Sequence, residues 1–208
     1  MKFNLIDKEN WKRKEYFKHY FDTVPCTYSA VFQIDVTDLK NKGFRVYPSL
    51  IYSLTKAVNS HEEFKTCFDK EGRLGFFDVM VPAYTVFSKK TETFSVLWTN
   101  ADGDYEKFLS DYEKDAENYG GKEVLFPKPD MPENCFNVSA VPWEKFEGFN
   151  LNLQKTFDYL LPIFTFGKIT ETDGKYLMPL AVQVHHAVCD AFHVCRLVKE
   201  LQEKLNQF

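Results

Sequence analysis

The chain has 208 residues, enough for one domain with a sizeable core, and we expect a single domain over residues 1–208. Its net charge is −4 with scattered basic residues, which excludes the basic stripe of a nucleic-acid-binding protein. No apolar run reaches the roughly 20 residues of a membrane span, and the start lacks a signal peptide's apolar segment. Five cysteines without a C-x-x-C pair indicate reduced thiols, so we expect a cytoplasmic protein.

The expected elements alternate between helices and strands over the first 134 residues. Apolar residues at helical spacing predict helices, and alternating apolar runs predict strands between them. In chain order, the predicted elements are a helix over Asp7–Phe21, a strand over Thr27–Thr37, a helix over Ser49–Ser60 with Pro48 in its first turn, a hairpin of Phe64–Asp69 and Leu74–Phe77 around Gly72, strands over Val81–Phe87 and Thr93–Trp98, and a helix over Asp104–Tyr119. Prolines at 127, 129 and 132 make residues 122–134 a loop.

The last third is rich in predicted strands and ends in a helix. The predicted strands are Cys135–Val141, Phe149–Gln154, Tyr159–Lys168 and Tyr176–Val184, with a hairpin turn at Thr172-Asp173-Gly174 before the last one. Phe192–Leu205 has apolar residues at helical spacing. These elements predict one mixed α+β domain.

Two adjacent histidines, His185 and His186, end the last predicted strand. Successive strand side chains point to opposite faces, so one histidine can be buried while the other faces a cavity. A neutral imidazole at the mouth of an apolar site suits general-base chemistry near neutral pH. Other interpretations are that the histidines are packing residues, that Asp190 caps the following helix, or that His185, His186, Asp190 and His193 ligate a metal.

The order of these residues resembles a known signature. His-His-x-x-x-Asp at a strand-to-helix junction is similar to the motif of the CoA-dependent acyltransferases, and Gln183 to Asp190 with Phe192-His193 resembles the type A chloramphenicol acetyltransferases. Short similarities in the right order extend this resemblance from about Phe3 to Gln202, through Asn10-Trp11-x-Arg13-x-x-x-Phe17, Pro25-Cys26, Thr91-Glu92-Thr93-Phe94-Ser95, Pro132-Glu133-Asn134 and Phe149-Asn150-Leu151-Asn152. Ala191 stands where the family has Gly, and we expect it to adopt a negative φ that an alanine accepts.

The resemblance implies a two-layer α/β sandwich, with a mixed β-sheet and helices on one face, that forms a homotrimer with active sites between subunits. It implies transfer of an acetyl group from acetyl-CoA, as co-substrate, to the 3-hydroxyl of chloramphenicol without an acyl-enzyme. His186 is then the general base, Ser139 stabilises the oxyanion and Thr165 assists through a bound water. Asp190 pairs with Arg13 and holds the active-site loop.

The resemblance also implies binding residues. The acceptor pocket comprises Tyr20, Cys26, Tyr28, Phe94, Asn137, Phe149, Leu151, Ile163 and Gln183, and the CoA tunnel passes Ser95 and Lys168. No metal is implied. Two alternatives are a related CoA-dependent acyltransferase acting on another alcohol and a non-catalytic binder of aromatic compounds.

Overall fold

The computed structural model describes residues 1–153 and 158–208. Within these residues, a seven-stranded sheet forms one layer, in the order β2-β10-β8-β7-β5-β6 with β9 beside β10. Pairing is parallel between β5 and β7 and between β7 and β8, and antiparallel elsewhere. The strands are β2 Thr27–Asp35, β5 Val81–Ser88, β6 Thr93–Trp98, β7 Cys135–Ala140, β8 Ile163–Phe166, β9 Thr170–Thr172 and β10 Lys175–His185.

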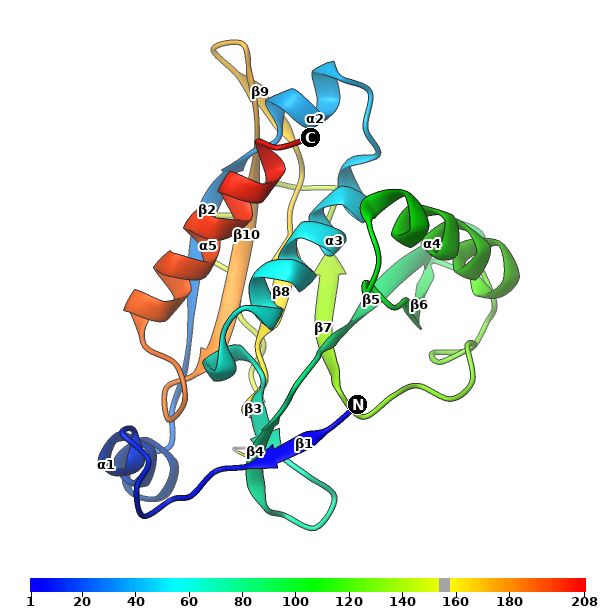
Figure 1. Cartoon of the computed structure of the whole chain (residues 1–208). Coiled ribbons are helices and arrows are strands. Elements are labelled where there is room, and N and C mark those ends of the chain that lie inside the picture. The colour runs from blue at the N-terminus through cyan, green and yellow to red at the C-terminus, as the bar shows by residue number, and fades with distance from the viewer. Residues whose placement is uncertain (154–157) are drawn as a thin grey trace.

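Helices form the second layer. Figure 1 shows α3 (Val46–Asn59), α4 (Tyr105–Tyr119) and α5 (Ala191–Leu205) together on one face of the sheet. Their apolar stripes, including Leu50, Leu54, Leu197 and Leu201, are fully buried, which removes apolar surface from water and stabilises the two-layer arrangement. The predicted two-layer mixed α+β fold is confirmed.

The strand residues alternate between the helix-covered face and the opposite face. Val138, Phe164 and Val182 belong to the buried apolar core that includes the helix residues. Their neighbours Ser139, Thr165 and Ala181 are aligned across β7, β8 and β10, and the period-two alternation of a strand turns them to the other face. The sheet face without helices therefore carries the predicted oxyanion residue.

A separate small sheet contains the predicted hairpin. β3 (Thr66–Phe68) pairs with β4 (Leu74–Phe77), and Gly72 in the connecting turn has φ +74°, which glycine adopts without strain. The hairpin prediction is confirmed. β1 (Phe3–Leu5) adds to β4, and neither β1 nor the short helix α2 (Thr37–Asn41) was predicted.

The first predicted helix begins later than expected. The side chain of Asp7 accepts hydrogen bonds from the backbone N–H of Glu9 (3.1 Å) and from Asn10 Nδ2 (2.7 Å), so this segment makes a turn in place of a first helical turn. The helix α1 covers only Lys14–Phe17 and continues as a π-helix over Lys18–Thr23. The prediction of a single helix over residues 7–21 is therefore wrong at its start.

Two predicted strands of the last third were also wrong in extent. Residues 149–153 form no strand, because the Gln183 side chain satisfies the backbone of Leu151: its Oε1 accepts from the Leu151 N–H (2.6 Å) and its Nε2 donates to the Leu151 carbonyl (2.8 Å). Gln154, the end of that prediction, lies outside the described residues. The strand predicted from Tyr159 starts only at Ile163, directly after Pro162, which has no N–H to donate to a ladder.

Candidate active site

The two histidines at the end of β10 occupy different environments. His185 is 1% exposed, and its Nδ1 accepts a hydrogen bond from the Ala187 N–H at 3.1 Å. The side chain of His186 is 29% exposed. The prediction that one histidine is buried and the other accessible is confirmed.

Two tyrosines hold the ring of His186. Tyr20, on the π-helix, stacks on it with centroids 3.9 Å apart, and Tyr28 of β2 meets it edge-on at 5.4 Å. His186 Nδ1 is buried, 3.3 Å from Asp190 Oδ1 but without hydrogen-bond alignment, which leaves Nε2 as the nitrogen that a substrate can reach. Burial raises the pKa of Tyr28, whose hydroxyl donates to the Cys189 carbonyl at 3.4 Å and thus remains a neutral wall of the site.

Arg13, immediately before α1, ties this turn to the first helix. Its Nη1 and Nη2 donate to the two Asp190 carboxylate oxygens at 2.6 Å each, in the planar fork that guanidinium and carboxylate groups prefer. Nη2 also donates to the His186 carbonyl and Nε to the Ala187 carbonyl, both at 2.8 Å. The hydrogen bonds from Arg13 hold the pKa of Asp190 below its usual value, so the pair is ionised. The structure therefore brings together the predicted Arg13, Asp190 and His186.

The backbone of the turn is fully hydrogen-bonded. The His186 N–H donates to the carbonyl of Cys26 (3.0 Å), and the Val188 and Cys189 N–H groups donate to the His185 carbonyl (both 3.1 Å). The Asp190 N–H donates to Nδ1 of His193 at 2.9 Å. With the Ala187 contact, every amide from 186 to 190 has an acceptor, so the turn that carries His186 has a fixed backbone.

Ala191 fits its position without strain. It is the first residue of α5, and among the described residues the non-glycine positions with positive φ are Glu92, Asp130 and Asp173. The expectation that Ala191 adopts no positive φ is confirmed.

Ser139 and Thr165 form a second polar centre on the helix-free face of the sheet. They are register partners on β7 and β8, and their hydroxyl oxygens are 2.9 Å apart. Thr165 is 2% exposed, whereas Ser139 is partly exposed. If Thr165 donates to Ser139 Oγ, the single hydroxyl proton of Ser139 is free for an external acceptor.

Ser139 faces an apolar cavity of about 420 Å³. Four predicted pocket residues line it with Ser139, namely Phe94, Asn137, Leu151 and Ile163, and residues that the sequence did not single out complete it, including Thr85, Phe87, Val96 and Trp143. Gln183 does not line this cavity but fixes Leu151, as described above. Phe149 packs on Phe146 at 5.3 Å, and Cys26, Tyr20 and Tyr28 lie with His186.

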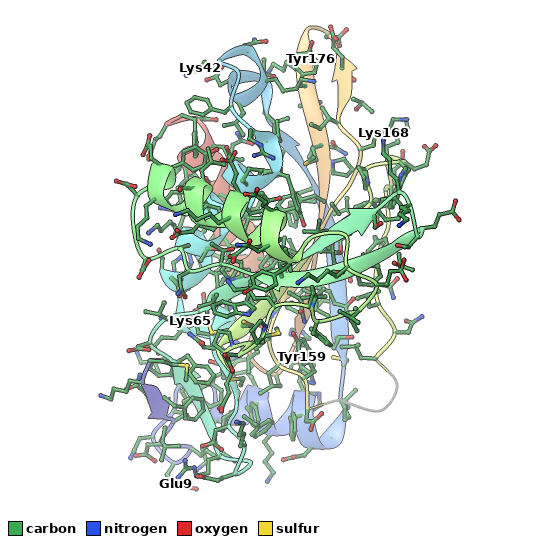
Figure 2. All side chains as sticks on the ribbon, turned by 90° about the vertical axis from the view of Figure 1, so that its right-hand side faces the viewer. Glu9, Lys42, Lys65, Tyr159, Lys168 and Tyr176 are labelled. Atoms are coloured by element: carbon green, nitrogen blue, oxygen red, sulfur yellow. The ribbon has the colours of Figure 1, made fainter. Side chains whose placement is uncertain are left out.

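A second cavity, of about 530 Å³, adjoins the first. The two share Thr85, Phe87 and Ala140, and the second is lined further by Lys168 and Ile169. Figure 2 shows Lys168 on the same side of the molecule as the β5–β6 ribbon and well away from Tyr159. Ser95 is buried with its hydroxyl against the carbonyls of Lys122 (2.9 Å) and Val124 (3.0 Å), and lines neither cavity.

The histidine turn and the Ser139 cavity are separate within one chain. Ser139 lies two strands from β10, roughly 10 Å, and His185 lies four residues beyond the Ala181 position aligned with Ser139, roughly 13 Å along the strand. Their α-carbons are therefore roughly 16 Å apart. Tyr28, which contacts His186, pairs with Val184 and so points to the sheet face opposite Ser139.

Two properties of the described residues bear on alternative functions. Among residues 1–153 and 158–208, no group of three or more His, Cys, Asp or Glu side chains is arranged to hold a metal ion. No helix in the described part of the chain is both long enough and apolar enough to span a bilayer.

Comparison with known proteins shows which family this chain resembles in sequence. A family model described as chloramphenicol acetyltransferase matches residues 1–202. A chloramphenicol acetyltransferase of Clostridium perfringens is 54% identical over 206 residues, covering 99% of this chain and 100% of the relative. One of Campylobacter coli is 55% identical over 207 residues, covering 100% of both.

Solved structures have the same fold. One named chloramphenicol acetyltransferase has a TM-score of 0.83 at 20% identity and covers 98% of this chain and 100% of its own. A dihydrolipoamide acetyltransferase of Azotobacter vinelandii has a TM-score of 0.67 at 17% identity, covering 92% and 85%. Because these identities are low, the two structures bear on the fold alone. From the family match and the relatives above half identity, the chain belongs to the chloramphenicol acetyltransferase family, a family of acyltransferases.

Proposed function

We propose that this protein is a cytoplasmic enzyme that transfers the acetyl group of acetyl-CoA to the 3-hydroxyl of chloramphenicol. The observation that carries this proposal is the family match over residues 1–202, with relatives of that name above half identity over the full length. The apolar cavity beside Ser139 suits an acceptor with an aromatic ring, because such ligands bury most of their surface against apolar and aromatic side chains.

His186 acts as the general base. Its Nε2 removes the proton from the 3-hydroxyl as the hydroxyl oxygen attacks the thioester carbonyl carbon. The new C–O bond forms, the C–S bond then breaks, and the proton passes to the departing CoA thiolate. No acyl-enzyme forms. The proposal is supported by the accessible ring between Tyr20 and Tyr28 and by the hydrogen-bonded turn that fixes it.

Ser139 stabilises the oxyanion that develops on the thioester oxygen. A donor aimed at this charge before the reaction begins needs no reorganisation during it. The 2.9 Å contact with buried Thr165 supports this role, because Thr165 can occupy one lone pair of Ser139 Oγ and orient its proton outward. The role of Thr165 through a bound water, implied by the family, becomes in this proposal a direct hydrogen bond.

The cavity lined by Lys168 and Ile169 is the proposed binding place of CoA. It shares lining residues with the Ser139 cavity, so a thioester reaching along it would end beside the acceptor. Lys168 provides a charge for a phosphate group. Ser95 contributes indirectly, by fixing the backbone at Lys122 and Val124.

The active site is shared between subunits of a homotrimer. A base and an oxyanion donor that serve one substrate must both lie within hydrogen-bond reach of the reacting group. In one chain, however, the Ser139 and His185 α-carbons are roughly 16 Å apart and the His186 ring leans on the opposite sheet face. His186 of one subunit therefore meets the Ser139 cavity of a neighbour.

A thiol-release assay tests the proposed function. Free CoA should appear only when acetyl-CoA and chloramphenicol are both present. Release with another alcohol but not with chloramphenicol would favour a related acyltransferase. Tight chloramphenicol binding without any thiol release would favour a non-catalytic binder.

A further inference from the structure

The residue at the third position of helix α5 has a contact that the proposed mechanism does not use. His193 Nδ1 accepts a hydrogen bond from the backbone N–H of Asp190 at 2.9 Å, and the His193 side chain is 23% exposed. Asp190 is the residue immediately before α5, and a side chain at the third helical position often reaches back to that residue's N–H. Glutamate or glutamine usually makes this contact, so a histidine here is unusual.

This contact holds the last backbone amide of the turn that carries His186. The amides of His186, Val188 and Cys189 are held by carbonyl groups of the chain, and that of Asp190 is held by His193. Without His193, a partly buried N–H at the start of α5 has no acceptor in the protein, which such groups tolerate poorly. The same residue, Asp190, presents the carboxylate that fixes Arg13.

We infer that His193 is a positioning residue that acts on His186 through the Asp190 backbone, and that it does so only as a neutral imidazole. Nδ1 must carry a lone pair to accept the Asp190 N–H, and a protonated ring has no acceptor left. Protonation therefore places the Nδ1–H of His193 against the N–H of Asp190, and the hydrogen bond at the start of α5 is lost. This inference rests on the proposed function for its catalytic part.

The surroundings of His193 are mixed in charge. The cleft beside it, of about 340 Å³, and the segments packed against it bring charged groups of both signs close together. The negative groups are Asp190, Glu62 and Glu63, the positive groups are Lys12, Arg13 and Arg196, and Tyr16 also lines the cleft. Burial is the largest influence and lowers the pKa of His193. This direction agrees with the neutral ring that the hydrogen bond requires.

Two substitutions at this position separate positioning from packing. His193→Gln keeps an acceptor that reaches the Asp190 N–H and cannot titrate near neutral pH, whereas His193→Leu fills the space without an acceptor. Above the usual histidine pKa of about 6.5, His193→Leu should lower kcat by about tenfold to a hundredfold with KM for both substrates nearly unchanged. His193→Gln should stay within a few-fold of wild type. The exposed Cys195→Ala, on the same helix, is the matched control and should have wild-type kinetics.

Thermal unfolding against pH supplies a readout that does not depend on turnover. A histidine pKa lowered by folding contributes stability that is fully present above about pH 6.5 and is lost as the pH falls toward the lower folded-state value. The wild-type midpoint should therefore fall over this range, and the fall should be smaller in His193→Gln.

The outcomes are distinct. Equal kcat values for His193→Leu and wild type, or equal impairment of His193→Gln and His193→Leu, would overturn the positioning role. If the wild type itself releases no thiol, the proposed function fails, and the inference is then decided by unfolding: an acid loss that is identical in wild type and His193→Gln would overturn it. If His193→Leu does not fold, the kinetics and the acid profile of His193→Gln decide in the same way.

Discussion

The histidine turn and the Ser139 cavity are built by different physical means. The turn from His185 to Asp190 is fixed by hydrogen bonds from residues far away in sequence, above all the four from Arg13. The cavity is built by strand register, which aligns Ser139 with Thr165 and leaves apolar side chains around them. A proton-transfer group needs one orientation, whereas an apolar binding site needs shape. The comparison predicts that breaking the hydrogen bonds that fix the turn affects rate and stability together, and that damage to the cavity affects rate or binding alone.

The largest effect is expected from removing the proposed base. His186→Ala should lower kcat by at least about 10²–10⁴-fold, the range of general-base catalysis, because the substitution removes the imidazole that takes the proton. Its unfolding temperature should stay close to wild type, since the side chain is 29% exposed and its Nδ1 has no hydrogen-bond partner among the described residues.

The matched control is His185→Ala. His185 is buried and holds the Ala187 amide, so its loss should lower the unfolding temperature in addition to any effect on rate. If His185→Ala abolished turnover without destabilisation while His186→Ala retained turnover, the assignment of the base would be wrong.

The next effect belongs to the cavity. Ser139→Ala should lower kcat by about 10²–10³-fold, the scale of one lost oxyanion donor, with KM and unfolding temperature nearly unchanged. Thr165→Val removes only the partner that orients Ser139 and should cost less. The rate of thiol release with both substrates at saturation measures kcat for each variant. A Ser139→Ala enzyme with wild-type kcat would remove the serine from the mechanism.

Breaking the ion pair of the turn should change stability and rate together. Arg13→Ala and Asp190→Asn each leave polar groups without partners, which costs about 1–3 kcal/mol of unfolding free energy. The full 3–5 kcal/mol for a buried pair is not expected, because the Asp190 side chain is 35% exposed. An Arg13→Ala, Asp190→Asn double variant should be little worse than either single one, and strict additivity would contradict the coupling.

The same ion pair makes the stability of the fold depend on pH in the acidic range. Because folding lowers the pKa of Asp190, its contribution to stability is fully present above about pH 4 and is lost as the pH falls through the lower folded-state value. Asp190→Asn should lack this part of the acid loss in thermal unfolding. An unchanged acid profile in Asp190→Asn would show that another carboxylate is responsible.

The smallest effect concerns Ala191. Because this residue starts α5 without a positive φ, Ala191→Gly should leave kcat within a few-fold and lower stability by at most about 1 kcal/mol, since glycine is the poorer helix former. A marked gain in kcat or in unfolding temperature would show that alanine is strained in this turn.

Much of the fold could be predicted from the sequence, because the long helices and strands carry clear apolar periodicity. The failures have local causes that periodicity does not contain. Asp7 forms a turn with its own side chain before α1, and the Gln183 amide replaces strand pairing at Leu151. Both depend on a side chain bonding to backbone, and the second depends on residues 32 positions apart.

The site was predicted unevenly for the same reason. His186, Asp190 and Arg13 follow a motif, and the structure brings them together. The cavity residues Thr85, Phe87 and Trp143 have no motif, and only the β5–β7 pairing and the loop after β7 place them beside Ser139. His193 could have been found from its position three residues after Asp190, where a side chain can reach back to the start of the helix.

In the proposed trimer, His186 of one subunit serves the Ser139 cavity of another, and mixing two inactive variants tests this arrangement directly. Sedimentation should first give a mass near three times 24.4 kDa. His186→Ala subunits, with an intact cavity, are then unfolded and refolded together with an equal amount of Ser139→Ala subunits, which retain the base. In a cyclic trimer with random mixing, about a quarter of the sites combine an intact base with an intact cavity, so about a quarter of wild-type activity should return. If the mixture refolds into trimers but stays at the residual activity of the separate variants, the site lies within one subunit and the account is contradicted.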